Sequence, residues 1–431
     1  MRILHTADWH FGKTLEGRDR TLEQAAVVDE LIALCDAESI DLVLMAGDVY
    51  QTVNPSADAE ALFYRALDGL SAGGKRAVVV IAGNHDNAER IRAARPIADK
   101  LGITLMGLPK DDLRPTPMDS NRVTRVAAGI GYVELAIPGC TDHCVIALLP
   151  YPSESRLNEV LAKTLDEQEL QSNYSRRIGE WFAALADHFR PDTVNLAMSH
   201  LYVQGGMESE SEVQIQIGGA YAVHASAFPA SAQYVALGHL HRPQAVNGAP
   251  VPVRYAGSPL CYSFSEAGQT KSVVVIDAVP GAPATIREIP LHSGKPLVRW
   301  KATQGLAQVM QWVEEGRDAE AWIDLEVLVE TGLQLEEIHR LRDLHPGFVH
   351  IRPVFSEQAP GSGADPTETT AGLSVEALFR KFFTDRSKTD ADDELVQLFL
   401  ELVHEAEETP GDTGGQEEPT PAGDGVEGVG A

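Results

Sequence analysis

The stretch MRILHTADWH (residues 1–10) joins an apolar, β-prone run to the polar motif Asp8-Trp9-His10. Further along the chain, the runs Leu42–Ala46 and Ala77–Ala82 have the same character as Arg2–Ala7, and all three predict β-strands that end where a polar residue begins. The later polar motifs are, in order, Gly47-Asp48, Gly83-Asn84-His85-Asp86, Ser199-His200 and Gly238-His239-Leu240-His241. Ligands of open α/β sheets bind beyond the carboxyl ends of the strands, so we expect all five motifs to share one crevice.

Seven side chains in these motifs are candidate metal ligands: Asp8, His10, Asp48, Asn84, His200, His239 and His241. Their mixture of oxygen and imidazole donors suits two divalent ions such as manganese or iron. Asp48 is the candidate bridge, because a carboxylate can hold two cations about 3.5–4 Å apart. Asp8 and His10 stand two residues apart, and an extended backbone would point both to one side. A paired metal site is typical of displacement at phosphorus, so the sequence indicates a phosphoesterase.

His85 follows Asn84 directly and cannot easily face the same ion. An imidazole that titrates near neutral pH suits contact with a phosphate oxygen or protonation of the leaving oxygen. We expect Asp86 to orient His85 through its other ring nitrogen, with a helix N-cap as the equally open alternative for Asp86. Six basic residues in or next to the motif loops are candidates for contacts to DNA phosphates: Lys13, Arg18, Arg20, Arg90, Arg92 and Arg242.

The motif order DxH, GD, GNHD, a lone His and GHxH resembles that of the calcineurin-like metallophosphoesterases. The flanking residues in Met1–His10, Ala82–Asp86, Ala236–Arg242 and Tyr255–Leu260 narrow the resemblance to the SbcD-like nucleases, counterparts of the eukaryotic double-strand-break repair nuclease. This resemblance implies an α/β fold, with a two-sheet sandwich flanked by helices. It extends at lower density to about residue 405. Gln51 departs from the family, in which Asp or His is common, and any catalytic help from this position is therefore in doubt.

The same resemblance implies a DNA exonuclease and endonuclease that acts on double-stranded ends and hairpins in repair and recombination, usually with manganese. One ion would be bound by Asp8, His10, Asp48 and His241, and the other by Asp48, Asn84, His200 and His239. Water activated by the ions would attack phosphorus while His85 assists departure of the sugar oxygen. The implied partners are an SbcC-like coiled-coil ATPase and a second copy of the chain, as a homodimer within a heterotetramer.

Length and composition are those of a soluble globular protein of two domains or more, with 431 residues of which 44% are hydrophobic. We expect no membrane-spanning segment and no export signal, because no apolar run approaches about 20 residues and the N-terminus leads directly into a strand. A cytoplasmic protein, associated with the nucleoid when bound to DNA, is the resulting expectation. Four cysteines are too few for a disulfide framework.

The formal net charge of −28 does not favour binding to DNA. From Thr389 onward the chain has thirteen Asp or Glu and no Lys or Arg, yet the remainder is also acidic. Non-specific affinity for DNA comes mainly from Lys and Arg. Either bound metals and a partner supply the positive field, or the substrate is something else.

Five segments are expected. Residues 1–290 form the metallophosphoesterase domain, in which strands alternate with helices up to a helix near Glu89–Leu101. Residues 291–355 predict a β-α-β-α-β module, which by resemblance is a capping domain. Residues 356–372 have the composition of a linker and 406–431 that of a disordered acidic tail. Residues 373–405 predict a helical pair with apolar residues on more than one face, which would dock on the partner ATPase or fold back on the body.

Two other functions stay open. A small-molecule metallophosphatase or cyclic-nucleotide phosphodiesterase would use the same metal core, since such a site defines phosphoester hydrolysis and not the substrate. The additional module and the helical pair favour the nuclease. A non-catalytic assembly scaffold is the second alternative, although a decayed site should have lost a ligand and all seven candidates are present.

Overall fold

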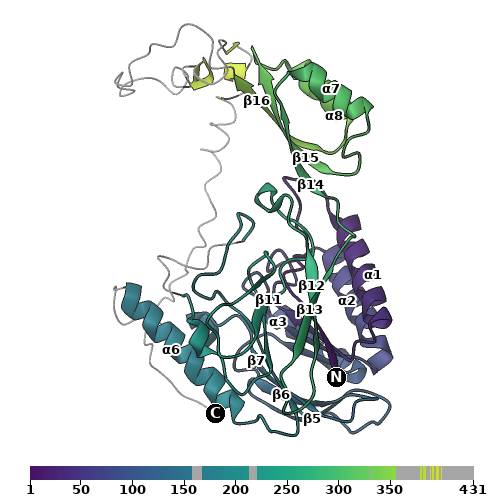
Figure 1. Cartoon of the computed structure of the whole chain (residues 1–431), viewed down its shortest axis with the longest axis vertical. Helices are drawn as coiled ribbons and strands as arrows, with labels where there is room; N and C mark the ends of the chain where they lie inside the picture. Colours follow the sequence, from purple (N-terminus) through teal and green to yellow (C-terminus); the bar gives the residue numbers. More distant parts are fainter. Residues whose placement is uncertain are drawn as a thin grey trace, which may run out of the picture.

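The computed structural model describes residues 1–157, 167–212, 221–330 and 332–355. Beyond these it describes Phe379, Arg380, 382–384, Thr389, Ala391, Asp392, 395–397 and Phe399. Two large β-sheets form the body with helices on their outer sides, and a smaller module stands at one end of it (Figure 1). The predicted two-sheet α/β sandwich is confirmed.

Six strands form the first sheet in the order β13-β12-β1-β2-β3-β4. Neighbours from β1 to β4 pair in parallel, whereas β12 and β13 are antiparallel additions at the other edge. The bounds are β1 Arg2–Thr6, β2 Leu42–Ala46, β3 Ala77–Ile81, β4 Ile103–Met106, β12 Ser272–Asp277 and β13 Thr285–Pro290. The carboxyl ends of β1, β2 and β3 therefore lie at the same edge of the sheet.

Seven strands form the second sheet in the order β10-β11-β9-β8-β7-β6-β5. The central strands β7, β8, β9 and β11 run parallel to one another. The bounds are β5 Thr124–Gly129, β6 Tyr132–Ala136, β7 Cys144–Leu149, β8 Val194–His200, β9 Tyr234–Gly238, β10 Gln244–Ala245 and β11 Val253–Tyr255. His200 is the last residue of β8, whereas His239 and His241 follow the end of β9.

The core explains why the central strands are apolar throughout. In β2, Leu42 and Leu44 belong to the cluster between the two sheets, whereas Val43 and Met45 pack with the helices on the outer side. Successive strand residues point to opposite faces, and both faces of this sheet are covered, so alternation with polar residues is absent. Each such side chain contributes about 1.5–3 kcal/mol when fully buried.

Helices cover the outer face of each sheet. Two of them, α1 (Thr21–Ala37) and α2 (Ala57–Ser71), lie against the first sheet, and Ser56 accepts a hydrogen bond from Ala59 N (3.3 Å) as the N-cap of α2. The longer α6 (Glu167–Ala186) packs on the second sheet through buried side chains such as Phe182. The layers are therefore helix, sheet, sheet, helix.

The single helix predicted near Glu89–Leu101 is wrong. The segment forms α3 (Ala88–Ala93), the short α4 (Arg95–Ala98) and a 3₁₀ turn (Asp99–Leu101). Pro96 explains the break, because proline has no backbone N–H and is tolerated only in the first turn of a helix. A further short helix, α5 (Glu154–Leu157), follows the second sheet's β7.

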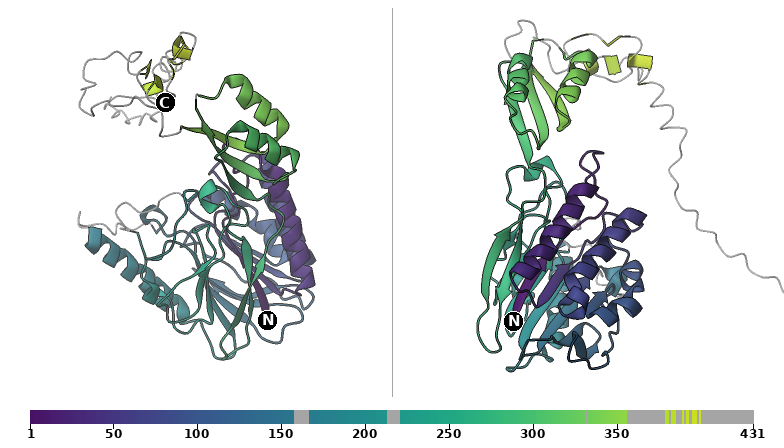
Figure 2. Two further views of the ribbon diagram at one scale, coloured as in Figure 1. Left: turned by 45° about the horizontal axis from the view of Figure 1, so that its top comes forward. Right: turned by 90° about the vertical axis from the view of Figure 1, so that its right-hand side faces the viewer.

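The smaller module has the predicted β-α-β-α-β order and stands above the body (Figure 2). Its elements are β14 Leu297–Ala302, α7 Leu306–Glu314, β15 Trp322–Val329, α8 Leu335–Leu344 and β16 Phe348–Phe355. The three strands pair in parallel around a core that includes Trp300 and Phe348. The module is tied to α1, because the Glu23 carboxylate accepts from Trp322 Nε1 (2.9 Å) and Lys295 N (2.7 Å). Its role as a capping domain stays a prediction.

The predicted linker (356–372) and acidic tail (406–431) lie outside the described residues, as does most of the predicted helical pair (373–405). Within that pair, the rings of Phe379 and Phe399 stack with centroids 4.0 Å apart. Among the described residues, no helix combines the length and the apolar character needed to span a bilayer.

Candidate metal centre

The five polar motifs meet where the carboxyl ends of the two sheets face each other. Asp8 and His10 follow β1, Asp48 follows β2, and Asn84 follows β3. His200 ends β8, and His239 and His241 follow β9 in the second sheet. Backbone hydrogen bonds from Asp8 N to Gly47 O and from His10 N to Asp48 O, both 3.0 Å, hold the first two loops together. The five motifs are therefore brought together, as the sequence predicts.

The loops reach this arrangement through unusual backbone conformations. The φ angles of Asp8, His10, Asp48 and His239 are +54°, +48°, +54° and +109°. Asp and His visit the left-handed region more often than most residues, but it is rare for any side chain with a Cβ. The expectation that an extended path aligns Asp8 with His10 is therefore wrong: two left-handed residues, not strand alternation, bring them together.

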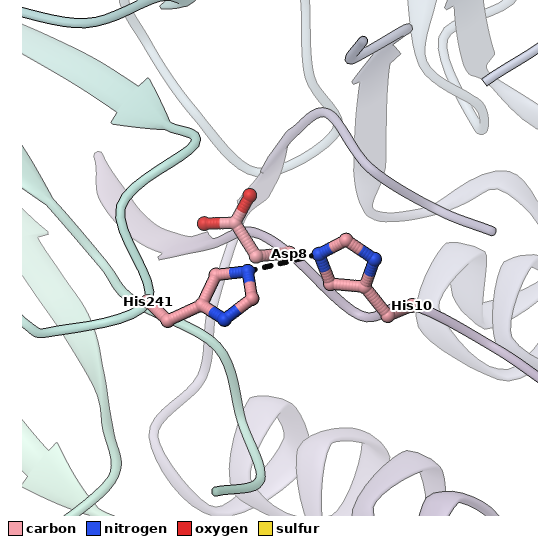
Figure 3. A group of neighbouring side chains, drawn as sticks. All are labelled: Asp8, His10 and His241. Carbon is pink, nitrogen blue, oxygen red and sulfur yellow. Dashed lines mark hydrogen bonds between the residues drawn. The ribbon is translucent and has the colours of Figure 1, made fainter. Parts of the chain in front are cut away.

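Asp8, His10 and His241 form one end of the cluster, with their ligand atoms within 4.8 Å of one another (Figure 3). His10 Nε2 and His241 Nε2 are 3.0 Å apart. Two ligands bound at right angles and about 2.1 Å from one cation would be separated by about 3 Å. The pair is thus spaced as two ligands of a single ion.

Asp48 lies between this end of the cluster and the other. Its Oδ2 is 3.6 Å from His10 Nε2 and 3.4 Å from His200 Nε2. On the far side, Asn84 Oδ1 lies 2.8 Å from His200 Nε2 and 3.3 Å from His239 Nδ1. This arrangement matches the position expected for a bridging carboxylate.

The centre is buried, and the carboxylates of Asp48 and Asp8 outweigh the effect of burial on His200 and raise the pKa of that imidazole to about 9. All seven candidate ligands are buried except Asn84, which is half-buried. Burial raises the pKa of Asp8 well above its ordinary value, and Asp8 Oδ2 and His10 Nδ1 have no hydrogen-bond partner among the described residues. Burial lowers the pKa of His239 to about 3 and that of His241 to about 4, so both rings are neutral at pH 7, as metal ligands must be. These residues fit divalent cations.

Neighbouring groups orient two of the imidazoles. His200 Nδ1 lies 2.9 Å from Ala46 O, to which it donates, and this leaves Nε2 for the cluster. His241 Nδ1 lies 2.5 Å from Ser211 Oγ, which donates in turn to Glu266 (2.5 Å). Lys271 Nζ donates to the other oxygen of Glu266 (2.5 Å). Such partners hold the ring orientation and tautomer of a ligand.

Ser211, Glu266 and Lys271 could not be recognised from the sequence. They belong to no motif, and only the proximity of their loops in the fold reveals them.

Glycines make room for the Asp48 carboxylate and the His200 ring. A Cβ on Gly83 would lie 2.1 Å from Asp48 Oδ1, and one on Gly47 would lie 2.4 Å from His200 Nδ1. Both separations are far shorter than any van der Waals contact. Gly47 and Gly83 therefore both permit a backbone approach that a residue with a Cβ would prevent.

His85 lies beside the cluster, with its ring centroid 4.8 Å from that of His10. The prediction that Asp86 orients His85 is wrong. The Asp86 carboxylate instead accepts from the backbone N–H groups of Val49 (3.1 Å), Tyr50 (3.0 Å) and Gly83 (2.8 Å).

The Nδ1 atom of His85 contacts the backbone of Gln51 instead of Asp86. Nδ1 lies 2.8 Å from the carbonyl oxygen of Gln51, so the backbone of that position, not its side chain, contacts the imidazole. The N-cap alternative for Asp86 is also wrong, because Asn87 caps α3 by accepting from Glu89 N and Arg90 N.

Three of the basic residues predicted to contact DNA form ion pairs within the protein. Arg20 is buried and pairs with Glu23, and this prediction is wrong because the guanidinium is not accessible. Arg90 pairs with Glu60, and Arg92 pairs with Asp111 and Glu89.

The other three basic candidates lie closer to the crevice or to solvent. Lys13 lies beside the centre and donates to Ser211 O (2.8 Å). Arg18 donates to Phe348 O in the smaller module (3.1 Å), and Arg242 is exposed. Their contacts to DNA stay predictions.

Comparison with known proteins gives matches over most of the chain. A family model described as calcineurin-like phosphoesterase matches residues 1–243, and one described as type 5 capsule protein repressor C-terminal domain matches residues 293–387. The chain is 50% identical to the Bacillus subtilis protein named as the SbcD component of the nuclease SbcCD, over 409 residues that cover 95% of this chain and 99% of the relative.

Two further relatives carry the same name. The protein from Rhodobacter capsulatus is 38% identical over 314 residues, 71% of this chain and 73% of its own length. The protein from Escherichia coli K12 is 28% identical over 418 residues, 94% of this chain and 98% of its own length.

Proposed function

Because the chain belongs to the SbcD family of calcineurin-like phosphoesterases, we propose that it is the metal-dependent nuclease component of an SbcCD-type complex. The reaction is hydrolysis of phosphodiester bonds in double-stranded DNA, as an exonuclease at ends and as an endonuclease at hairpins. One observation carries the proposal: seven candidate ligand side chains from five separate segments of the chain meet at one largely buried point, where their carboxylates attract positive charge.

Two divalent ions fit the donor set. One would be held by Asp8, His10, Asp48 and His241, and the other by Asp48, Asn84, His200 and His239. Bound there, such ions supply an activated water and stabilise charge that develops on the phosphate. Manganese is the metal that we propose, because the site mixes hard oxygen donors with imidazole nitrogens.

His85 delivers the proton that the leaving sugar oxygen needs. Its Nδ1 is engaged by the Gln51 carbonyl, and this fixes the ring and leaves Nε2 for proton transfer. The ring lies next to His10, and its ligand atom lies within 4.8 Å of those of His10 and Asp48. A phosphate bound at the cluster would therefore be within reach of the imidazole.

Because the chain is acidic, it requires a positively charged partner to bind DNA. With a net charge of −28, most of its surface repels a polyanion. An SbcC-like coiled-coil ATPase would supply positive charge, and the helical pair at 373–405 is the segment proposed to dock on it. The smaller module (291–355) would cap the crevice, and the assembly would be a heterotetramer built on a homodimer of this chain in the cytoplasm.

Cleavage of hairpin DNA tests the proposal. The purified chain, mixed with its coiled-coil ATPase, should cut a radiolabelled hairpin only when Mn²⁺ is present. Asp48→Asn should abolish cleavage, because an amide cannot bridge two cations as a carboxylate does. Asp112→Asn, at an exposed position, is the matched control and should leave cleavage unchanged.

An aryl phosphate substrate separates the nuclease from the other candidates. A small-molecule phosphatase would hydrolyse it quickly and leave the hairpin intact. A scaffold would act on neither substrate, with or without metal. Either result would contradict the nuclease assignment.

A further inference from the structure

Arg156 is a polar side chain near the metal centre that belongs to none of the five motifs. It lies in α5, in the segment that follows β7. Its Nη1 donates to Gly83 O (2.7 Å) and its Nη2 donates to Asp86 O (2.6 Å). The guanidinium therefore joins two carbonyl groups at the two ends of one short loop.

That loop carries Asn84 and His85, the two functional residues between the bonded carbonyls. Its inner side is held by carboxylates: Asp86 accepts from Gly83 N (2.8 Å), and Asp48 Oδ1 accepts from His85 N (2.9 Å). Among the described residues, Arg156 is the side chain that donates to the loop's carbonyl groups. Without it, the inward contacts of the loop remain but these two carbonyl groups lose their donor.

The surroundings of Arg156 show that its charge has no ordinary ion-pair role. The side chain is half-buried, and no carboxylate in the described part of the chain forms a salt bridge with it. Its guanidinium lies over the ring of Tyr151, 5.2 Å from the centroid, and Tyr151 N donates to Ala82 O (3.0 Å) next to the same loop. Removing a cation from water without a direct ion pair is costly, and the two hydrogen bonds, together with the nearby charges of Asp86 and Asp48, offset that cost.

We propose that Arg156 is a positioning residue for the nuclease reaction, which holds Asn84 and His85 in line with the other metal ligands through the carbonyls of Gly83 and Asp86. It acts through the loop and touches neither the ions nor the DNA. The inference rests on the proposed function, because it assigns a role within the same reaction. Two parallel N–H groups in a planar fork suit this bridging, and a lysine ammonium cannot reproduce it.

The expected effect is on turnover and not on binding of DNA. Loss of groups that orient metal ligands typically costs about 10–100-fold in activity or metal affinity. Arg156→Ala should therefore lower kcat within that range and leave KM for DNA unchanged. Arg156→Lys should recover only part of the loss.

The experiment uses the full chain with its ATPase partner, Mn²⁺ and a hairpin substrate. It compares kcat, KM and the salt dependence of KM for Arg156→Ala, Arg156→Lys and the control Arg114→Ala, whose side chain is exposed. Guanidinium ion at low millimolar concentration, added to Arg156→Ala, tests chemical rescue. Hydrogen–deuterium exchange of the amides in residues 83–87, measured without metal or DNA, reports on the loop independently of activity.

Faster exchange in residues 83–87 of Arg156→Ala, a fall in kcat and partial rescue by guanidinium would support the proposal. Unchanged exchange and kcat would overturn it. So would a rise in KM with a weaker salt dependence, which would make Arg156 a phosphate contact instead. If Arg156→Ala does not fold, Arg156→Lys gives the same readouts. If the wild-type complex cuts no DNA, the proposed function fails, while the exchange data still decide whether Arg156 holds the loop.

Discussion

Replacing Gly83 with alanine would place a methyl group against the carboxylate of Asp48, the proposed bridging ligand. The new Cβ would lie 2.1 Å from Asp48 Oδ1, 2.3 Å from Asp48 N and 2.7 Å from Asp48 Cγ. Non-bonded heavy atoms prefer about 3.5 Å or more, so Asp48 or the loop must move by about 1 Å. Asp48 is poorly able to yield, since its carbonyl accepts from His10 N and its Oδ1 accepts from His85 N.

A shift of this size is large for a metal ligand, whose distance must hold to within about 0.2 Å. Overpacking of this kind costs about 1–3 kcal/mol, and each 1.4 kcal/mol corresponds to a factor of about ten. We therefore expect Gly83→Ala to weaken Mn²⁺ binding by about 10–100-fold. Cleavage of a hairpin at subsaturating Mn²⁺ should fall at least as much.

Calorimetric titration of the metal-free chain with Mn²⁺ measures the first effect, and hairpin cleavage measures the second. Gly179→Ala is the matched control, because Gly179 lies in α6 and its Cβ would meet its nearest neighbour, Ala227, at 3.7 Å, an ordinary van der Waals contact. It should leave both measurements unchanged. Wild-type Mn²⁺ affinity in Gly83→Ala would refute the reasoning, since it would mean that the Asp48 carboxylate is not where the ions bind.

Three other predictions concern His85, Glu134 and Glu23. His85→Gln should keep Mn²⁺ affinity but lose about 10²–10⁴-fold in kcat, as expected for a proton donor; loss of metal in calorimetry would instead make His85 a ligand. Glu134→Gln should lower the melting temperature at pH 7, because the hydrogen bond from Arg190 holds the pKa of Glu134 below its ordinary value of 4.5. That stabilisation is present above the ordinary pKa of 4.5 and is lost as pH falls through the lowered pKa of the folded state, so the gap from wild type should close as pH falls below 4.5; a constant gap would contradict it. Glu23→Gln should lower the free energy of unfolding by about 3 kcal/mol, since it leaves the buried Arg20 without its counter-charge. It should also speed hydrogen exchange at the Trp322 indole N–H in NMR spectra. An unchanged exchange rate would show that Glu23 does not tie the smaller module to α1.

The sequence predicts those parts of the site that depend on which residues follow each strand. Asp48 and Asn84 stand just after apolar runs, and parallel strands bring their ends together, so the convergence of these residues could be inferred from the sequence. Around Pro96 the sequence holds two conflicting signals, because proline ends helices whereas the apolar pattern favours one continuous helix.

The sequence could not predict which groups each charged side chain contacts in the fold. Arg20 and Arg242 look alike beside the motifs, yet one is buried against Glu23 and the other is exposed. Asp86 bonds backbone groups of another loop, and Arg156 reaches back to residues more than 60 positions earlier. Such choices depend on which segments the fold places side by side, and no local pattern carries that information.

The left-handed conformations of Asp8, His10, Asp48 and His239 bear on how the protein acquires its ions. Each strained residue costs on the order of 1–3 kcal/mol, and cations at about a hundred times their dissociation constant would return about 2.7 kcal/mol to the native state. In newly made molecules without metal, the segments that carry these four residues should thus be less stable than the two sheets. Proteases should cut those segments first. Metal supply in the cell would then govern how long each molecule survives, in addition to whether it is active.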